Sequence, residues 1–337
     1  MKSNVSSLVI TSLGLTLFSQ VSFANNQSDL PFYAASLSEN VSTYCETTQC
    51  KTHTLDKNAL RQFIKANEYA DDVKEALSLS EYEVLVGDAI IDSSTSPTLV
   101  MEITTSWRGI PIDDMNVTQA IGLPVTQEKI DNAANLMLEQ WVNHIRNAEI
   151  LDAERIYETV GASDYHQEMT IPSTIGDFSL QQQALYRDPM QGSIARYEHP
   201  EYADAVVDIT VYPVSPFTYT NTMDDADLLA AELSSEQLQV QALVEQAGIN
   251  EYSISDVKPL KIEQQDQVLE GYAFEVKLNT GIEPVYTTNY LFKKGDKFVK
   301  LSGNFPGMVM LPIVEQSIAK IEVPPESKFM RSMRADG

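Results

Sequence analysis

The chain has 337 residues, of which 43% are hydrophobic and 21% are charged, and this composition indicates a packed globular protein rather than a disordered one. Its formal net charge is -25, so binding to nucleic acid or docking on an anionic lipid surface is not expected. A divalent cation or a basic partner fits this charge, although an acidic surface that keeps the protein in solution explains it more simply.

Residues 1–24 have the three parts of a secretory signal peptide. Lys2 supplies a short positive region, Leu8 to Phe18 form an apolar core, and Ser22 and Ala24 are the small residues that a leader peptidase reads. We therefore predict cleavage after Ala24 and export to the periplasm; an N-terminal core helix is the alternative. The apolar core is too short to span a bilayer, and no later stretch is apolar enough, so no membrane span is predicted.

The two cysteines, Cys45 and Cys50, are separated by four residues in a polar turn. In an oxidising compartment this pattern predicts a structural disulfide between them. A redox or metal role remains as the alternative. His53 is close in sequence, but one His and two Cys fall short of a closed metal site.

Residues 25–160 are predicted to form an N-terminal α+β domain. Residues 25–54 look irregular, and apolar spacing predicts a helix over residues 56–78. Two extended runs follow, Tyr82 to Ile91 and Thr98 to Trp107, and the turn-forming residues between them indicate a hairpin.

The clearest helix prediction is Thr126 to Ala148, with Thr126 as the N-cap. A second helix is predicted from Ile150 to Val160, ended by Gly161. The first of these helices carries a single apolar stripe, made of Ile130, Ala133, Ala134, Met137, Leu138, Trp141, Val142 and Ile145.

Residues 161–325 are predicted to form a second α+β domain of antiparallel strands with packed helices. A long helix is expected from Met223 to Ala247, with Thr222 as N-cap, and a closing helix from about Pro312 to Lys320. Residues 326–337 are expected to be a loose tail. The predicted strands are Ile194 to Tyr197, Ala205 to Tyr212, Val257 to Ile262, Val268 to Leu278, Tyr286 to Phe292 and Phe298 to Gly303.

The second half of the chain also resembles a known family. The matching stretches are Ile171-Pro172 with Gly176-Asp177-Phe178, then Gly192 to Tyr197, Ile209 to Pro213, and Tyr290 to Leu301. Together with the acidic-headed helix between them, they resemble the PsbP-like sandwich fold and exported bacterial proteins without an assigned function. That resemblance implies a non-catalytic binding or assembly factor, and it carries over no functional residue.

Reactive motifs are absent from the sequence: it has no G-x-S-x-G, H-E-x-x-H, P-loop, G-x-G-x-x-G or EF-hand loop. This absence favours a non-catalytic protein, and no cofactor is expected. Asp224, Asp225 and Asp227 could bind calcium, but their position at the start of a helix already explains them.

The sequence gives no firm support for the other candidate site residues. Asp113 and Asp114 follow Gly109-Ile110-Pro111 and resemble an acidic turn. A catalytic carboxylate pair is not favoured there, because neighbours on a strand point to opposite faces. His166, Glu168 and His199 could meet across strands and bind a metal, although their spacing does not require it.

Two functions follow as hypotheses. The first is an exported periplasmic binding or assembly factor that acts through a protein partner in the cell envelope. The alternative is a hydrolase of unfamiliar family that uses scattered carboxylates, and it requires a carboxylate with a raised pKa in a cleft.

Overall fold

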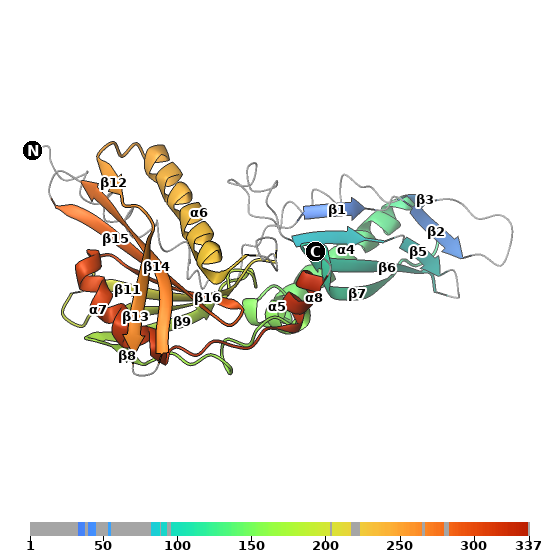
Figure 1. Ribbon diagram of the computed structural model, residues 1–337. Coiled ribbons are helices and arrows are strands. Elements are labelled where there is room, and N and C mark those ends of the chain that lie inside the picture. The colour runs from blue at the N-terminus through green and yellow to red at the C-terminus, as the bar shows by residue number, and fades with distance from the viewer. Residues whose placement is uncertain are drawn as a thin grey trace, which may run out of the picture. The chain divides into compact units, whose positions relative to one another are not determined.

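The computed structural model describes most of the chain after residue 81 and three short strands before it. The described residues are 33–37, 40–44, 53–54, 82–87, 89–92, 96–202, 204–216, 223–264, 267–279 and 283–335. They separate into two compact units, an N-terminal unit ending at Val160 and a C-terminal unit beginning at Gly161. Each unit combines a sheet with helices, so the predicted α+β class is confirmed (Figure 1).

The N-terminal unit is built on a seven-stranded sheet. In the sheet, β6 lies between β7 on one side and both β4 and β5 on the other. The pairs β1–β4 and β2–β5 are parallel, and the other pairs are antiparallel. The strands are β1 (Tyr33–Leu37), β2 (Asn40–Tyr44), β3 (His53–Thr54), β4 (Tyr82–Val86), β5 (Ala89–Asp92), β6 (Thr98–Trp107) and β7 (Ile110–Ala120).

Helix α4 (Gln127–Asn147) covers one face of this sheet, and α5 (Ala153–Val160) follows it. All eight residues of the predicted apolar stripe are buried, and the Thr126 hydroxyl accepts a hydrogen bond from the Lys129 N–H. The Trp141 indole donates to the Thr105 hydroxyl of β6 at 3.2 Å, which satisfies a buried polar group on each element. The stripe, the N-cap and the stop at Gly161 are therefore confirmed.

Three predictions for the N-terminal unit needed correction. The run from Tyr82 to Ile91 is two strands, interrupted after Val86, that both pair with β6. Residues 25–54, expected to be irregular, contain three short strands. The segment around Asp113 and Asp114 is not a turn but part of β7, an 11-residue strand. The predicted helix over residues 56–78 lies outside the described residues.

The C-terminal unit is built on a nine-stranded antiparallel sheet. Its order is β12-β14-β15-β16-β11-β10-β9-β8, with β13 also paired to β14. The strands are β8 (Thr174–Ile175), β9 (Phe178–Leu185), β10 (Ser193–Glu198), β11 (Val206–Pro213), β12 (Tyr252–Ile254), β13 (Lys258–Gln264), β14 (Gln267–Asn279), β15 (Pro284–Lys294) and β16 (Lys297–Gly303).

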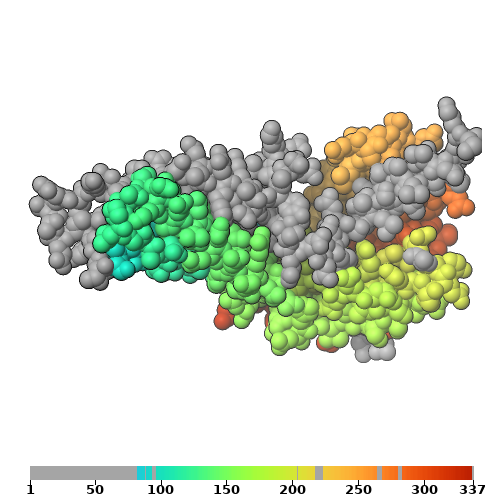
Figure 2. Space-filling view, turned by 180° about the vertical axis from the view of Figure 1, so that it is seen from behind, coloured from blue at the N-terminus to red at the C-terminus, as the bar shows by residue number. Residues whose placement is uncertain are grey.

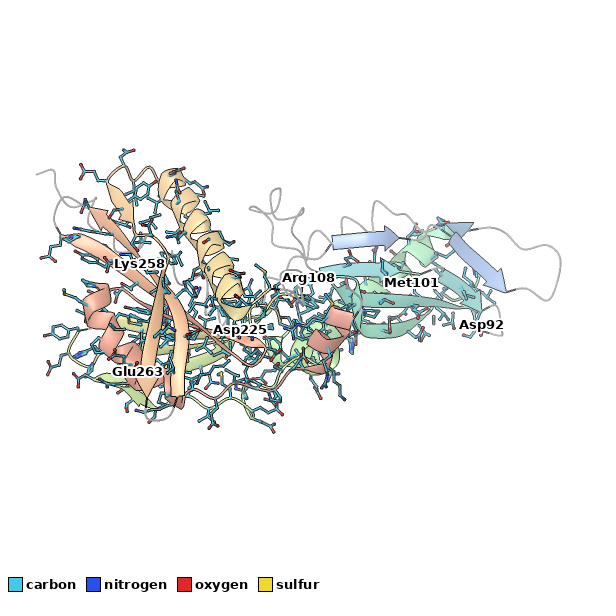
Figure 3. The ribbon with its side chains drawn as sticks, in the orientation of Figure 1. Asp92, Met101, Arg108, Asp225, Lys258 and Glu263 are labelled. Carbon is cyan, nitrogen blue, oxygen red and sulfur yellow. The ribbon has the colours of Figure 1, made fainter. Side chains whose placement is uncertain are left out.

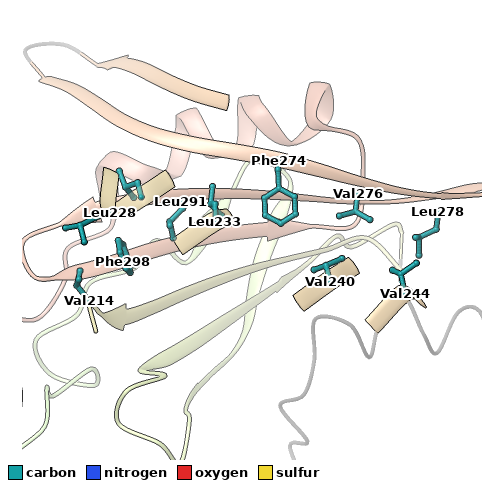
Figure 4. Close-up of a cluster of buried hydrophobic side chains, with 11 residues drawn as sticks. Val214, Leu228, Leu233, Val240, Val244, Phe274, Val276, Leu278, Leu291 and Phe298 are labelled. Atoms are coloured by element: carbon teal, nitrogen blue, oxygen red, sulfur yellow. The ribbon is translucent and has the colours of Figure 1, made fainter. Parts of the chain in front are cut away.

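Helix α6 (Asp225–Gln246) lies across one face of this sheet, over β14 and β15 (Figure 1). The apolar contact layer is shown in Figure 4, where Leu233 and Val240 of the helix meet Phe274 and Val276 of β14. Two details differ from expectation. The helix begins at Asp225 rather than at Met223, and Asp224 rather than Thr222 is its N-cap.

Helix α7 (Gly307–Ser317) contacts β8 and β15, and a 3-10 turn (Ile318–Lys320) follows it. The predicted start at Pro312 is wrong, because Pro312 lies inside the helix and Pro306 is the N-cap. The extra first turn is held by Met310, which is fully buried and packs against Gly303 of β16. Since β8 and β15 are far apart in the strand order, the sheet curls around this helix.

The predicted loose tail is also wrong. Residues Lys328–Ala335 form helix α8, whose Phe329 and Met330 are buried. Arg334 holds this helix in place: it pairs with Glu326 and donates to the Val214 carbonyl at 2.8 Å. These contacts come from segments distant in sequence, so local composition alone could not indicate them.

No helix in the part of the chain that the structure describes has the length and apolar character needed to cross a bilayer.

Candidate functional site

The three aspartates proposed for calcium lie at the start of α6, where they serve the helix. The Asp224 carboxylate accepts the backbone N–H of Asp227 at 2.8 Å, and Asp225 pairs with Lys293 at 2.9 Å. Figure 3 shows Asp225 at this end of α6. Among the residues with described positions, no group of three or more His, Cys, Asp or Glu side chains is arranged to hold a metal ion. Calcium binding at these aspartates stays a prediction without further support.

Cys45 and Cys50 lie outside the described residues, so the disulfide stays a prediction. The histidine proposals fall on residues that the structure does place. His166 follows Asp164, whose carboxylate accepts the backbone N–H of His166 at 3.0 Å in a local turn. The ring of His199 packs edge-on against Phe178, with centroids 5.2 Å apart.

Asp113 and Asp114 point to opposite faces of β7, as expected for neighbours on a strand. Asp113 is paired with His144 of α4, whose Nε2 lies 3.1 Å from the carboxylate. This pair has no local signal in the sequence, because the two residues are 31 positions apart. The pair joins the helix to an outer strand, and this role explains a partly buried carboxylate there without invoking catalysis.

A polar cluster fastens the middle of α6 to the sheet; we name it the α6 clamp, and it consists of Tyr212, Glu232, Glu236 and Lys300. The Tyr212 hydroxyl donates to Glu232 at 3.0 Å, and Lys300 of β16 pairs with Glu236. Burial, followed by the two neighbouring glutamates, raises the pKa of the Tyr212 hydroxyl. The clamp therefore holds two α6 carboxylates against the sheet by one neutral and one charged donor.

A second polar row runs across four strands of the same face. Arg196 makes a two-pronged ion pair with Asp208, with both contacts at 2.8 Å. On the next two strands of the sheet, the Ser302 hydroxyl of β16 donates to Asn289 of β15 at 2.7 Å. A slip of one residue between these strands would turn each of these side chains to the opposite face, so the row fixes the register of the sheet.

Glu232 is the carboxylate that best meets the requirement of the hydrolase hypothesis. Burial raises the pKa of its carboxyl above the ordinary value of 4.5; the Tyr212 hydrogen bond opposes this shift, and Glu236 adds to it. The folded chain therefore holds this proton more tightly than the unfolded chain. The stabilisation that results is fully present below pH 4.5 and is lost as pH rises through the raised pKa.

We accordingly expect Glu232→Gln, which mimics the protonated carboxyl, to gain stability relative to the wild type as pH rises from 4.5 towards 7. Urea unfolding followed by circular dichroism across this range measures the difference. Glu245→Gln, at an exposed position of the same helix, is the matched control for the substitution itself. Parallel curves for Glu232→Gln and the wild type would contradict the assignment.

A different kind of surface lies where β9 begins and β10 and β16 end. Four rings form a chain there: Phe178 contacts His199 and Phe305, with centroids 5.2 and 5.6 Å apart, and His199 contacts Tyr202 at 4.8 Å. We call this region the aromatic end, and it comprises Phe178, His199, Tyr202, Phe305, Met308 and Val309. Figure 2 shows the C-terminal unit from behind the view of Figure 1, and there β9 to β11 and their connections form the yellow-green surface.

The segment that carries Phe305 and Met308 is fixed by side chains from two strands. Thr288 of β15 donates to the Phe305 carbonyl at 2.8 Å, and Tyr290 donates to the Gly307 carbonyl at 3.1 Å. Glu275 of β14 accepts the Gly307 N–H at 2.7 Å. Because both backbone groups of Gly307 are bonded to the sheet, the first turn of α7 is held in one position.

Asn304 joins this segment to the β10–β11 connection. Its side chain accepts the Val206 N–H at 3.0 Å and donates to the Asp204 carbonyl. The two loops of the aromatic end are therefore tied to each other, although they are about one hundred residues apart in sequence.

Three apolar side chains project from this fixed frame. Met308 is 83% exposed, Tyr202 64% and Val309 49%. Single exposed apolar residues need no explanation, but several on one pinned frame are typical of a surface that another molecule covers. The aromatic end has no local signal in the sequence, because its residues come from three separate segments of the chain.

Comparisons with known proteins add little to this geometry. No family model matches the sequence, and a search of curated proteins found no match. Among solved structures, the chain is similar to the solution structure of cyanobacterial PsbP (CyanoP) from Synechocystis sp. PCC 6803. The match has a TM-score of 0.29 and 8% identity, and it covers 46% of this chain and 92% of that one. It agrees with the resemblance noted from the sequence at the coarse level of fold only.

Proposed function

We propose that the chain is an exported periplasmic protein that acts as a non-catalytic binding or assembly factor, with the aromatic end of its C-terminal unit as the surface that contacts a protein partner in the cell envelope. The observation that carries this proposal is Met308, which is 83% exposed on a helix turn pinned by Thr288, Tyr290 and Glu275. A frame fixed before binding loses little conformational freedom when a partner docks, so more of the contact energy remains as affinity.

The signal peptide predicted over residues 1–24 supports export, and the absence of catalytic sequence motifs supports a binding role. The polar groups of the C-terminal unit also fit this view. The α6 clamp has a structural task, since it fastens a helix to the sheet. By contrast, the exposed apolar side chains of the aromatic end are not explained by packing in the core.

Site-specific photocrosslinking in the producing cell tests the proposal. A photoreactive residue replaces Met308, and the matched control replaces Leu238, which is 68% exposed on α6. We expect one identified partner to attach at position 308 and not at 238. The same mass spectra read the first residue of the mature chain, which is Asn25 if the leader is removed after Ala24.

The identified partner, once purified, should bind Met308→Asp about tenfold or more weakly than the wild type, because burial of a Met side chain is worth about 1.5 to 3 kcal/mol. Leu238→Asp should bind normally. Equal labelling at both positions, or equal affinity of both variants, would count against the aromatic end as the contact surface.

The hydrolase hypothesis is the second candidate, and Glu232 with its raised pKa is the observation that favours it. Its carboxylate accepts the Tyr212 hydroxyl beneath α6, in contact with the sheet. Turnover of a substrate that is lost in Glu232→Gln, with the fold intact, would replace the binding proposal by this one.

A further inference from the structure

We infer that the aromatic end takes a cationic segment of its partner, in which Lys or Arg residues flank an apolar side chain. This inference rests on the proposed function, since it presupposes that the surface binds a protein, and it adds the chemistry of the partner. It is carried by the charges around the exposed apolar side chains.

Three segments form the aromatic end: residues 173–180, 198–206 and 303–317. None of them contains a Lys or an Arg. The carboxylates in these segments are all exposed, namely Asp177, Glu198, Glu201, Asp204 and Glu315. The exposed apolar residues therefore lie on segments whose charged side chains, leaving His199 aside, are all acidic.

These carboxylates face solvent, and the cation nearest to them in sequence, Arg196, is held by Asp208. The remaining acidic group near the α7 start, Glu275, is already used by the Gly307 N–H. At physiological salt, charges act over roughly 8 Å, so the local carboxylates decide the sign of the partner's charge rather than the net charge of the chain.

The aromatic rings favour the same partner. A Lys ammonium or an Arg guanidinium is attracted to the face of a Tyr or Phe ring, and Tyr202 is 64% exposed. An anionic lipid surface, which would accept an apolar side chain such as Met308, is repelled by the surrounding carboxylates. The combination of apolar anchor and negative rim therefore selects a basic protein segment.

A second copy of this chain fits the surface less well. The basic helix α8 carries Lys328, Arg331 and Arg334, but its apolar residues Phe329 and Met330 are buried in its own unit. Arg334 is already paired with Glu326. This helix thus has no apolar side chain of that pair left to offer to a second molecule.

Fluorescence anisotropy with two matched peptide pools tests the inference on the full mature chain. Each peptide in the first pool has one Leu, Met, Phe or Trp flanked by two Lys on each side, and the second pool has Glu in place of Lys. We expect saturable binding of the Lys pool only, with affinity that falls as salt rises.

The double variant Glu198→Gln/Glu201→Gln removes two of the rim charges. It should bind the Lys pool about threefold to tenfold more weakly than the wild type. Glu128→Gln/Glu139→Gln is the matched control, because it makes the same charge change at exposed positions of α4, and it should stay within about twofold of the wild type.

The outcomes separate the inference from the function beneath it. Equal binding of the two pools, no binding of the Lys pool at millimolar concentration, or an unchanged affinity of the Glu198→Gln/Glu201→Gln variant overturns the charge inference. The crosslink at position 308 would still support a partner of another charge. Loss of that crosslink as well would remove the proposed function itself.

Discussion

Replacing Asp296 by Asn should destabilise the C-terminal unit by about 3 to 5 kcal/mol, because it removes one partner of a buried ion pair. The Lys297 ammonium lies 2.6 Å from Asp296, and its side chain is fully buried. Burial lowers the pKa of Lys297, and the Asp296 carboxylate is the main group that opposes this shift. Asparagine keeps the shape of the side chain but leaves the buried cation without its counter-ion.

The two tryptophans, Trp107 and Trp141, both lie in the N-terminal unit, which makes the measurement selective. In urea, circular dichroism should show the C-terminal unit unfolding at a lower midpoint concentration of urea. The midpoint measured by tryptophan fluorescence should not change. Asp225→Asn is the matched control, since Asp225 is 67% exposed in its pair with Lys293, and it should cost less than about 1 kcal/mol.

A second variant tests whether the unpaired Lys297 charge causes the loss of stability. Adding Lys297→Met to Asp296→Asn removes the unpaired charge and should recover a large part of the lost stability. If Asp296→Asn were as mild as Asp225→Asn, the buried pair would not carry the stability that its geometry implies.

Gly192→Ala should destabilise the same unit by more than about 4 kcal/mol, and two separate causes add up to this loss. Gly192 has a φ of +69°, a conformation that costs an alanine roughly 1 to 2 kcal/mol. In addition, a Cβ at this position would lie 1.9 Å from the Val211 carbonyl oxygen and 2.7 Å from the Tyr212 Cα. These are backbone atoms of β11, in the interior of the sheet, and they cannot move aside without breaking its pairing.

Gly248 provides a control that differs in only one of the two causes. Its φ is +70°, but a Cβ there would meet no atom within 4 Å. Gly248→Ala should therefore cost about 1 kcal/mol, from the backbone alone. Similar losses for the two variants in urea unfolding would show that the close approach of Gly192 to β11 is not tight in solution.

Elements with a strong periodic pattern could be predicted from the sequence. Helix α4 is the clearest case, because its stripe from Ile130 to Ile145 and its N-cap Thr126 are local signals. The strand β14 could be predicted for the same reason. Its alternation is a property of a few neighbouring residues and does not depend on the rest of the chain.

Elements that depend on distant partners could not be predicted. The strand β7 contains Pro111 and two adjacent aspartates, which look like a turn until His144 of α4 supplies a partner for Asp113. Helix α8 has only eight residues, and Arg334 stabilises it through Glu326 and the Val214 carbonyl. In each case the deciding contact lies outside the window that a pattern can sample.

The candidate site shows the same limit more strongly. The aromatic end joins Phe178 of β9, Tyr202 of the β10–β11 connection and Met308 of α7, and none of these segments alone indicates a binding surface. The absence of Lys and Arg could have been noticed in each segment. Its meaning depends on the strand order that brings the segments to one end of the sheet.

The return of α8 to the start of its unit has a consequence for how the polypeptide could be rearranged. The Phe329 N–H donates to the Gly161 carbonyl at 3.1 Å, and Thr170 exchanges two hydrogen bonds with Glu322 nearby. The entry and exit points of the C-terminal unit are therefore neighbours. A short linker could join them, and the chain could be cut open at an exposed turn such as Gly295, giving a circular permutant that keeps every strand beside its present neighbours.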